Sequence, residues 1–289
     1  MEMHQPDNWT LDFAALPPAR AELGESPVWS PAENCLWWVD ITGKRLFRTD
    51  AASGETHIWP TPEEAGCVVP MAGGGVAVGM ETGLYRFDSP SEQFSLVCAL
   101  GEPGIRFNDA ATDSAGRLWA GTMDIHNRSP IGKLVRIDPD GTLTVMQTGL
   151  RTPNGLALDA LGGRLYFSDS HADIQTIWTR LFDPATGGLG PRRVFARTDD
   201  LKGRPDGACL DEDGNYWIAA VGGGVIHVFA PDATRLAEIP TPTLDPTKPA
   251  FAGPDLGVLY LTSKTGPDGG GILVRAATDF RGRAQTPFG

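Results

Sequence analysis

A turn followed by a strand recurs six times along this 289-residue chain, and this repeat limits the possible folds more than any other feature. When the six copies are aligned, an aromatic or small apolar residue fills the same column in each copy: Trp37, Ala77, Trp119, Tyr166, Trp217 and Tyr260. Successive members of this column lie 40, 42, 47, 51 and 43 residues apart. Such a period, with several short strands in each repeat, is typical of a β-propeller blade. The sequence therefore predicts an all-β protein, a six-bladed β-propeller.

A second repeat follows the first in each unit, and it is an alternating apolar strand that runs into an Asp-containing turn, as at 44–55 and 132–143. Most units then continue into another strand, so that each supplies an inner strand, two middle strands and an outer strand. Helical periodicity is weak, and we expect almost no helix. Because a blade cannot bury its faces without neighbours, residues 1–289 are predicted to form a single propeller domain.

The two ends of the chain are expected to meet in the last blade. No outer strand follows the second repeat of the sixth unit (270–283), whereas the strand-like segment WTLDFAAL (9–16) has no role in the first unit. Pairing of this N-terminal strand with the last blade would close the ring and hide strand edges that invite aggregation.

The net charge and the N-terminal sequence limit the molecules that this protein is expected to bind and the compartment in which it is expected to occur. The net charge of −12 argues against nucleic acid and anionic membrane surfaces, both of which select clustered Lys and Arg, and is easier to reconcile with a neutral small molecule or a cation. No apolar run approaches the roughly 20 residues needed to span a bilayer. The N-terminus lacks the basic start and apolar stretch of a signal peptide. We expect a cytoplasmic protein that is a monomer or a weak oligomer.

Polar residues fill an equivalent slot in five of the six units, 11 or 12 residues before the aligned column. They are Glu25, Asn108, Asn154, Asp206 and Lys248. Because a propeller directs equivalent positions of its blades toward one axis, these side chains are expected at the mouth of the central channel. The second unit has Glu64-Ala65-Gly66-Cys67 in this region, and we expect no ligand from it.

Glu25, Asn154 and Asp206 together offer two carboxylates and one amide oxygen. This is a hard-oxygen set suited to one divalent cation, Ca²⁺, Mg²⁺ or Mn²⁺, with Zn²⁺ or Fe²⁺ as further candidates. Three protein ligands leave coordination positions open for water and substrate, as catalytic sites need. Taken singly, each residue has an ordinary interpretation: an Asn or Asp before Gly is usually a turn residue, and Glu25 could be a solvated acid. Asp109 either supports the site or caps a turn.

Several phrases together resemble the gluconolactonase family that includes regucalcin, also called senescence marker protein. They include GESPVW (24–29), RFNDAATDSAGRLWAGTM (106–123), PNGLALD (153–159) and RPDGACLDEDGNYWIA (204–219). The resemblance covers nearly the whole chain from about residue 20 and implies a six-bladed propeller that holds one divalent metal on its axis and hydrolyses sugar lactones. By motif, it implies that Glu25, Asn154 and Asp206 are the metal ligands and that Arg106 and Asn108 contact the substrate.

The chain departs from some members of the family shortly after residue 123. Where those members have an acidic pair that contacts sugar hydroxyls, this sequence reads AGTMDIHNRSP, which leaves Asp124 and His126 as candidate substrate contacts. The polar loop 124–131 is expected to form a lid or rim of the site.

The resulting hypothesis is a metal-dependent hydrolase that opens a sugar (aldono-) lactone to the aldonic acid. Asp206 is the candidate general base, since it could bind the metal and present its second oxygen to water. Arg106 and Asn108 would orient oxygens of the substrate. Two alternatives stay open: a non-catalytic calcium-binding or interaction propeller, and a different esterase or phosphotriesterase on the same metal scaffold.

Overall fold

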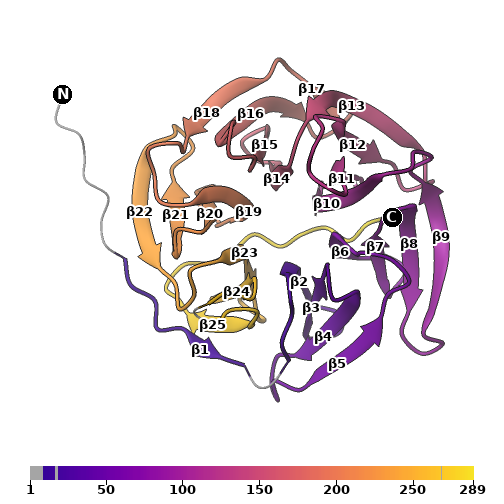
Figure 1. Ribbon diagram of the computed structural model, residues 1–289, viewed down its shortest axis with the longest axis horizontal. Helices are drawn as coiled ribbons and strands as arrows, with labels where there is room; N and C mark the ends of the chain where they lie inside the picture. The colour runs from indigo at the N-terminus through magenta and orange to yellow at the C-terminus, as the bar shows by residue number, and fades with distance from the viewer. Residues whose placement is uncertain (1–8, 17–18, 268) are drawn as a thin grey trace.

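The computed structural model describes residues 9–289 apart from 17–18 and 268, and it contains β-strands and loops only. Six sheets stand around a central axis like the blades of a propeller (Figure 1), which confirms the predicted fold. Within the described residues no segment forms a helix, so none is long and apolar enough to cross a membrane.

Each blade is an antiparallel sheet whose strands follow one another outward from the axis. Blade 1 consists of β2 (Gly24–Ser30), β3 (Cys35–Asp40), β4 (Arg45–Asp50) and β5 (Thr56–Pro60). Blade 2 consists of β6 (Cys67–Pro70), β7 (Val76–Gly79), β8 (Gly83–Asp88) and β9 (Gln93–Ala99). Blade 3 consists of β10 (Ile105–Thr112), β11 (Leu118–Asp124), β12 (Gly132–Ile137) and β13 (Leu143–Leu150).

Blade 4 consists of β14 (Pro153–Asp159), β15 (Arg164–Asp169) and β16 (Thr176–Asp183), with β17 (Gly188–Leu189) and β18 (Arg193–Arg197) both paired to β16. Blade 5 consists of β19 (Arg204–Leu210), β20 (Tyr216–Val221), β21 (Val225–Phe229) and β22 (Arg235–Pro240). Blade 6 consists of β23 (Pro246–Ala252), β24 (Val258–Ser263) and β25 (Val274–Ala277), and its fourth strand is β1 (Ala14–Ala15).

The pairing of β1 with β25 confirms that the N-terminal segment completes the last blade. The ladder is short, because only Ala14 and Ala15 pair, opposite Arg275 and Val274. Apolar contacts extend it: the Trp9 ring stacks on Phe280 with centroids 4.6 Å apart, and Leu11 and Phe13 pack against the cluster between blades 5 and 6.

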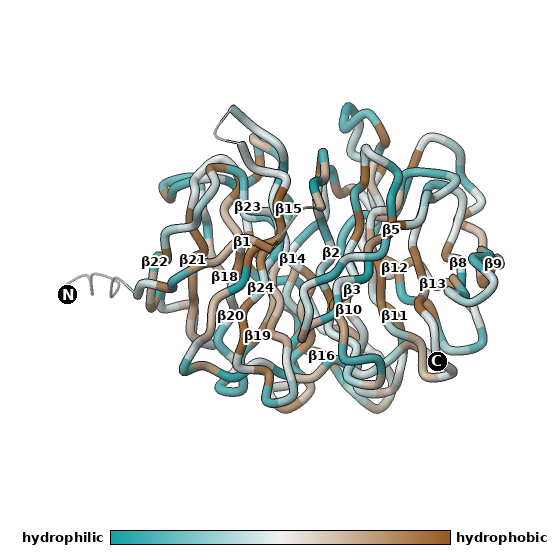
Figure 2. Tube along the Cα trace, turned by 90° about the horizontal axis from the view of Figure 1, so that it is seen from below, coloured by the Kyte–Doolittle hydropathy of each residue, from teal (hydrophilic) through white to brown (hydrophobic). Residues whose placement is uncertain are grey.

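The apolar cores lie between the blades. The aligned column falls on the second strand of every blade, and its six residues are almost fully buried. Six buried clusters fill the six interfaces between neighbouring blades, including one that joins blade 6 to blade 1. Seen from the side, the hydrophobic segments follow the strands and the loops at both rims are mostly hydrophilic (Figure 2).

A β-bulge interrupts the innermost strand of five blades at the same place. The register of β2, β10, β14, β19 and β23 against the next strand shifts across the slot predicted from the sequence, whereas β6 pairs with β7 without irregularity. A bulge bends the strand locally and redirects side chains, and it is common beside active sites. The slot is therefore a backbone feature as well as a sequence pattern, and blade 2 lacks both.

The C-terminal segment crosses the far mouth of the channel (Figure 1). Gly282 bridges to Asp211 at the end of β19, and Phe288 N donates to the carbonyl oxygen of Pro70 at the end of β6, 2.8 Å away. Because these are the carboxyl ends of innermost strands, the segment covers the opening opposite the strand starts that carry the polar slot.

Deletion of residues 1–16 is predicted to destabilise the ring. It removes β1 together with the half-buried side chains of Trp9, Leu11 and Phe13, each worth about 1 kcal/mol at partial burial. A loss of about 3 kcal/mol lowers Tm by roughly 6–12 °C. Thermal unfolding followed by circular dichroism measures the change, with Trp9→Ala as an intermediate case. An unchanged Tm would show that the ring closes without this strand.

Candidate functional site

A cavity of about 180 Å³ opens at the mouth where the innermost strands begin. Its wall is formed by side chains from blades 1, 3, 4, 5 and 6: Leu23, Glu25, Ile41, Arg106, Asn108, Met123, Asn127, Thr152, Asn154, Ser170, Arg204, Asp206, Val221 and Lys264. The cavity therefore brings together five residues named from the sequence, although they span positions 25–206 of the chain: Glu25, Arg106, Asn108, Asn154 and Asp206.

The three predicted metal ligands are buried on this wall, each less than one-tenth exposed. Asn154 joins two blades: its amide Nδ2 donates to a carboxylate oxygen of Asp206 in the next blade and to Ser170 Oγ, 3.2 Å away. Glu25 Oε2 accepts a hydrogen bond from the backbone N–H of Ser26 at 2.8 Å. The arrangement aims one amide and two carboxylates into the same space.

Backbone conformation explains the small residues that follow these ligands. Ser26 and Gly155, directly after Glu25 and Asn154, have φ values of 53° and 59°, in the left-handed region. Gly155 is also required by space, since a Cβ there would lie 2.4 Å from the hydroxyl of Tyr216. The PNG and ES sequences thus encode the bulge that turns the preceding side chain toward the axis.

Burial makes this site costly without a cation. Loss of solvation, reinforced by the charge of Asp109, raises the pKa of Glu25 to about 7. Loss of solvation likewise raises the pKa of Asp206 well above its usual range, and the charges of Glu25 and Asp109 add to the effect. Two buried carboxylates that repel one another favour either a proton or a metal ion between them.

The donor set fits a divalent cation. Asn154 Oδ1 is buried with no hydrogen-bond partner, an unusual state for a polar atom and one that a cation would satisfy. Nowhere in the described part of the chain do three or more His, Cys, Asp or Glu side chains gather as a metal cluster. The predicted set contains only two of these residue types, because its third member is an amide, and its oxygen ligands suit a hard cation.

Arg106 and Asn108 line the cavity but also bond to one another. Arg106 donates to Asn108 Oδ1 at 2.7 Å, and Asn108 Nδ2 donates to the carbonyl oxygen of Pro153 at 3.0 Å. Arg106 Nε lies 3.2 Å from a carboxylate oxygen of Glu64, so blade 2 contributes a counter-charge to the site, although we expected no ligand from it. The pair therefore fixes the wall beside Asn154, and its role as a substrate contact stays a prediction.

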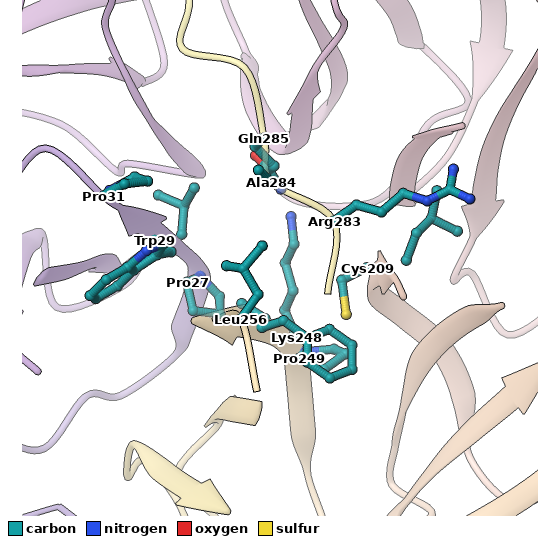
Figure 3. A pocket seen from close by; sticks show the side chains of 14 residues that line it. Pro27, Trp29, Pro31, Cys209, Lys248, Pro249, Leu256, Arg283, Ala284 and Gln285 are labelled. Carbon is teal, nitrogen blue, oxygen red and sulfur yellow. The ribbon is translucent and has the colours of Figure 1, made fainter. Parts of the chain in front are cut away.

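Asp109 and Lys248 form a buried ion pair across the channel behind the cavity. Lys248 Nζ donates to Asp109 Oδ1 and also, at 3.2 Å, to the carbonyl oxygen of Ala110, while Asp109 Oδ2 accepts from the backbone N–H of Leu156 at 2.7 Å. Figure 3 shows Lys248 extending into the channel from β23. Its stem passes over Gly207, where a Cβ would lie 2.5 Å from Lys248 Cβ. The pair connects blade 6 to blades 3 and 4 behind the cavity, so Asp109 does more than cap a local turn, and its support of the site stays a prediction.

Asp124 and His126 lie outside the cavity wall. The Asp124 carboxylate accepts hydrogen bonds from the backbone N–H groups of His126, Arg128 and Ser129, at 2.9, 3.2 and 2.9 Å, and the bond from His126 leads in lowering its pKa. It thus organises the loop that follows β11. The wall itself contains Met123 and Asn127 from this region. Substrate contact by Asp124 and His126 stays a prediction with no geometric support in this conformation.

Ser170, Arg204 and Lys264 belong to the wall but were missed from the sequence. Arg204 stands two residues before Asp206, and Ser170 closes the phrase YFSDS, so each adjoined a motif that was noticed. Lys264 directly follows β24, the second strand of the last blade, as Ser170 follows that of blade 4. The same repeat, read at the ends of the second strands, could have identified both.

Comparison with known proteins agrees with this architecture. The sequence profile described as the SMP-30/gluconolactonase/LRE-like region matches residues 23–265. The chain belongs to this family. Among SMP-30/gluconolactonase relatives, it is 36% identical to a pentonolactonase of Haloferax volcanii, covering 86% of this chain and 84% of that protein. It is 37% identical to a 6-deoxy-6-sulfogluconolactonase of Pseudomonas putida, covering 83% of each.

Solved structures of the SMP-30/gluconolactonase family share the fold. A regucalcin of Agrobacterium tumefaciens, described as a calcium-binding protein, superimposes with a TM-score of 0.93 at 24% identity, covering 99% of this chain and 100% of that one. A gluconolactonase of Xanthomonas campestris superimposes with a TM-score of 0.77 at 24% identity, covering 92% and 89%. At this identity the likeness establishes the propeller fold, and the family as a whole implies a divalent metal.

Lys248→Met is predicted to lower the free energy of unfolding by about 3–5 kcal/mol, because it leaves Asp109 buried without its cation. The double variant Asp109→Asn/Lys248→Met should lose less, since no charge is left unpaired. Urea unfolding in the presence of chelator measures both, and Lys264→Met, an exposed lysine of the same blade, should change the free energy by about 0.5 kcal/mol or less. Equal denaturant midpoints for Lys248→Met and the parent protein would contradict this assignment.

Proposed function

We propose that this protein is a sugar lactonase that requires one divalent cation, held by Glu25, Asn154 and Asp206. The observation that carries the proposal is an open cavity in which these three oxygen donors share a wall with Arg106 and Asn108. Relatives named for pentonolactone and sulfogluconolactone hydrolysis, at 36% and 37% identity over most of the chain, support the same substrate class.

Hydrolysis of a lactone needs a nucleophilic water, stabilisation of an oxyanion and a proton for the departing ring oxygen. A bound divalent cation supplies Lewis-acid polarisation of the lactone carbonyl. Arg106 and Asn108, whose hydrogen bonds hold them in place, present the polar wall against which the ring and its hydroxyls are oriented. Because Arg106 and Asn108 are buried, their interactions with a bound ring would be stronger than those of the same groups in water.

Asp206 is assigned the proton transfers. Its carboxylate accepts the proton of the attacking water as the new carbon–oxygen bond forms, and then delivers it to the ring oxygen as the ester bond breaks. The product is the open hydroxy acid. Proton transfer by a side chain held beside the reacting water is general acid–base catalysis. Asn154, which donates to Asp206, fixes the orientation of the carboxylate.

An assay of acid release over pentono- and hexono-lactones tests the proposal. A pH indicator should report hydrolysis well above the spontaneous rate, loss of activity after chelation, and recovery with one or more of Ca²⁺, Mg²⁺, Mn²⁺, Zn²⁺ and Fe²⁺. Cation binding without acid release from any lactone would instead favour a non-catalytic cation-binding propeller. Release from aryl esters or phosphotriesters alone would favour the other hydrolase class.

Asp206→Asn is predicted to lower kcat by at least 10²-fold, because it removes the proton acceptor while keeping an oxygen near the cation. Bound metal measured by isothermal titration calorimetry is the control, since the variant must still be loaded for the comparison to hold. Near-normal turnover with retained metal would show that another group accepts the proton.

A further inference from the structure

Two cationic side chains stand on the cavity wall, one from blade 5 and one from blade 6, where Lys264 bridges to Leu23 at the start of blade 1. Arg204 begins β19, and Lys264 follows β24. Both are exposed, and among the described residues no carboxylate lies within 4.0 Å of either. Arg204 gives one hydrogen bond, from Nη1 to the carbonyl oxygen of Ser170 at 3.2 Å. Since a guanidinium has five donors, most of its capacity is available to a ligand.

The charge of the wall is opposite to that of the protein. The carboxylates of Glu25 and Asp206 would be neutralised by the divalent cation of the proposed site, and Arg106 has Glu64 as a counter-charge. Arg204 and Lys264 are then the charges left without compensation at the mouth, in a chain whose net charge is −12. A cleft of one sign on a surface of the other sign attracts ligands of the complementary charge.

Arg204 lies a short distance from Asp206, the residue to which the proposed function gives the proton transfers. Arg204 and Asp206 are two residues apart on one strand, a separation of roughly 7 Å along the chain. That distance is comparable with the reach from a lactone carbonyl to a substituent on the far end of a six-carbon sugar. Hydroxyl groups of a neutral lactone do not require two cations, whereas an anionic group gains charge-assisted hydrogen bonds from them.

We infer that the substrate is a sugar lactone with a second, anionic group (carboxylate, sulfonate or phosphate ester) at the end remote from the lactone carbonyl, bound by Arg204 and Lys264. This inference rests on the proposed function and narrows its substrate class. The lactone ring lies against Arg106 and Asn108 on blade 3, and the anionic group points to the rim of blades 5 and 6, on the other side of the axis.

The test compares matched substrates: glucono-1,5-lactone and the same lactone with phosphate, sulfonate or an oxidised carboxylate at carbon 6, each corrected for spontaneous opening. At least one anionic lactone should show a kcat/KM about 10-fold or more above that of the neutral lactone. Arg204→Gln and Lys264→Gln should each lower the anionic-to-neutral ratio of kcat/KM by about 10-fold, chiefly through KM, as expected for loss of one charged hydrogen bond. Added salt should raise KM for the anionic lactone.

Lys202→Gln is the matched control. Lys202 lies two residues before Arg204, but its ammonium group pairs with Glu238 and does not line the cavity, so the ratio should be unchanged. A neutral lactone hydrolysed as well as every anionic one, or a ratio that neither variant alters, would overturn the inference and leave the lactonase proposal intact. No hydrolysis of any lactone would overturn both.

Discussion

Packing between neighbouring blades is the interaction on which the rest of this structure depends. Every buried apolar cluster joins two blades, and the six clusters complete a circuit from blade 1 round to blade 6 and back. A single blade would expose both faces of its sheet, so stability requires the whole ring. The same packing holds the site in place. Each predicted metal ligand lies near the start of an innermost strand, and the blade to which that strand belongs packs against a neighbouring blade on either side.

The same β-bulge recurs in five blades, but the side chains at the bulges differ in chemistry from one blade to the next. Five innermost strands bulge at the slot, yet the residues there differ: Glu25, Asn154 and Asp206 face the cavity, Asn108 links Arg106 to blade 4, and Lys248 crosses to Asp109. Blade 2 lacks the bulge and supplies the counter-charge of Glu64 from its loop. Symmetry builds the channel, and departures from symmetry distribute oxygen ligands, cations and hydrogen-bond donors around it.

Much of the fold was predictable because its signals are local. The column from Trp37 to Tyr260 is buried on the second strand of each blade, and the outer strands begin and end close to the segments expected, including the N-terminal one.

The site was predictable only in part. Five of its wall residues share the slot or its motif, whereas Asp124 turned inward to hold its own loop through three backbone N–H groups. Loop conformation depends on such competition between backbone and ligand contacts, which a linear pattern does not contain.

By itself the sequence determined the number of blades, the closure of the ring and the polar residues that share a slot, because a fixed period and short strand patterns specify these features locally. Only the tertiary structure decided what those residues face. Asp109 and Lys248, 139 positions apart, meet across the channel, while Arg204 and Lys264 come to the same rim. The local sequence turns a side chain at a bulge toward the axis, but the partner that it meets there comes from another blade and is in place only once the ring has closed.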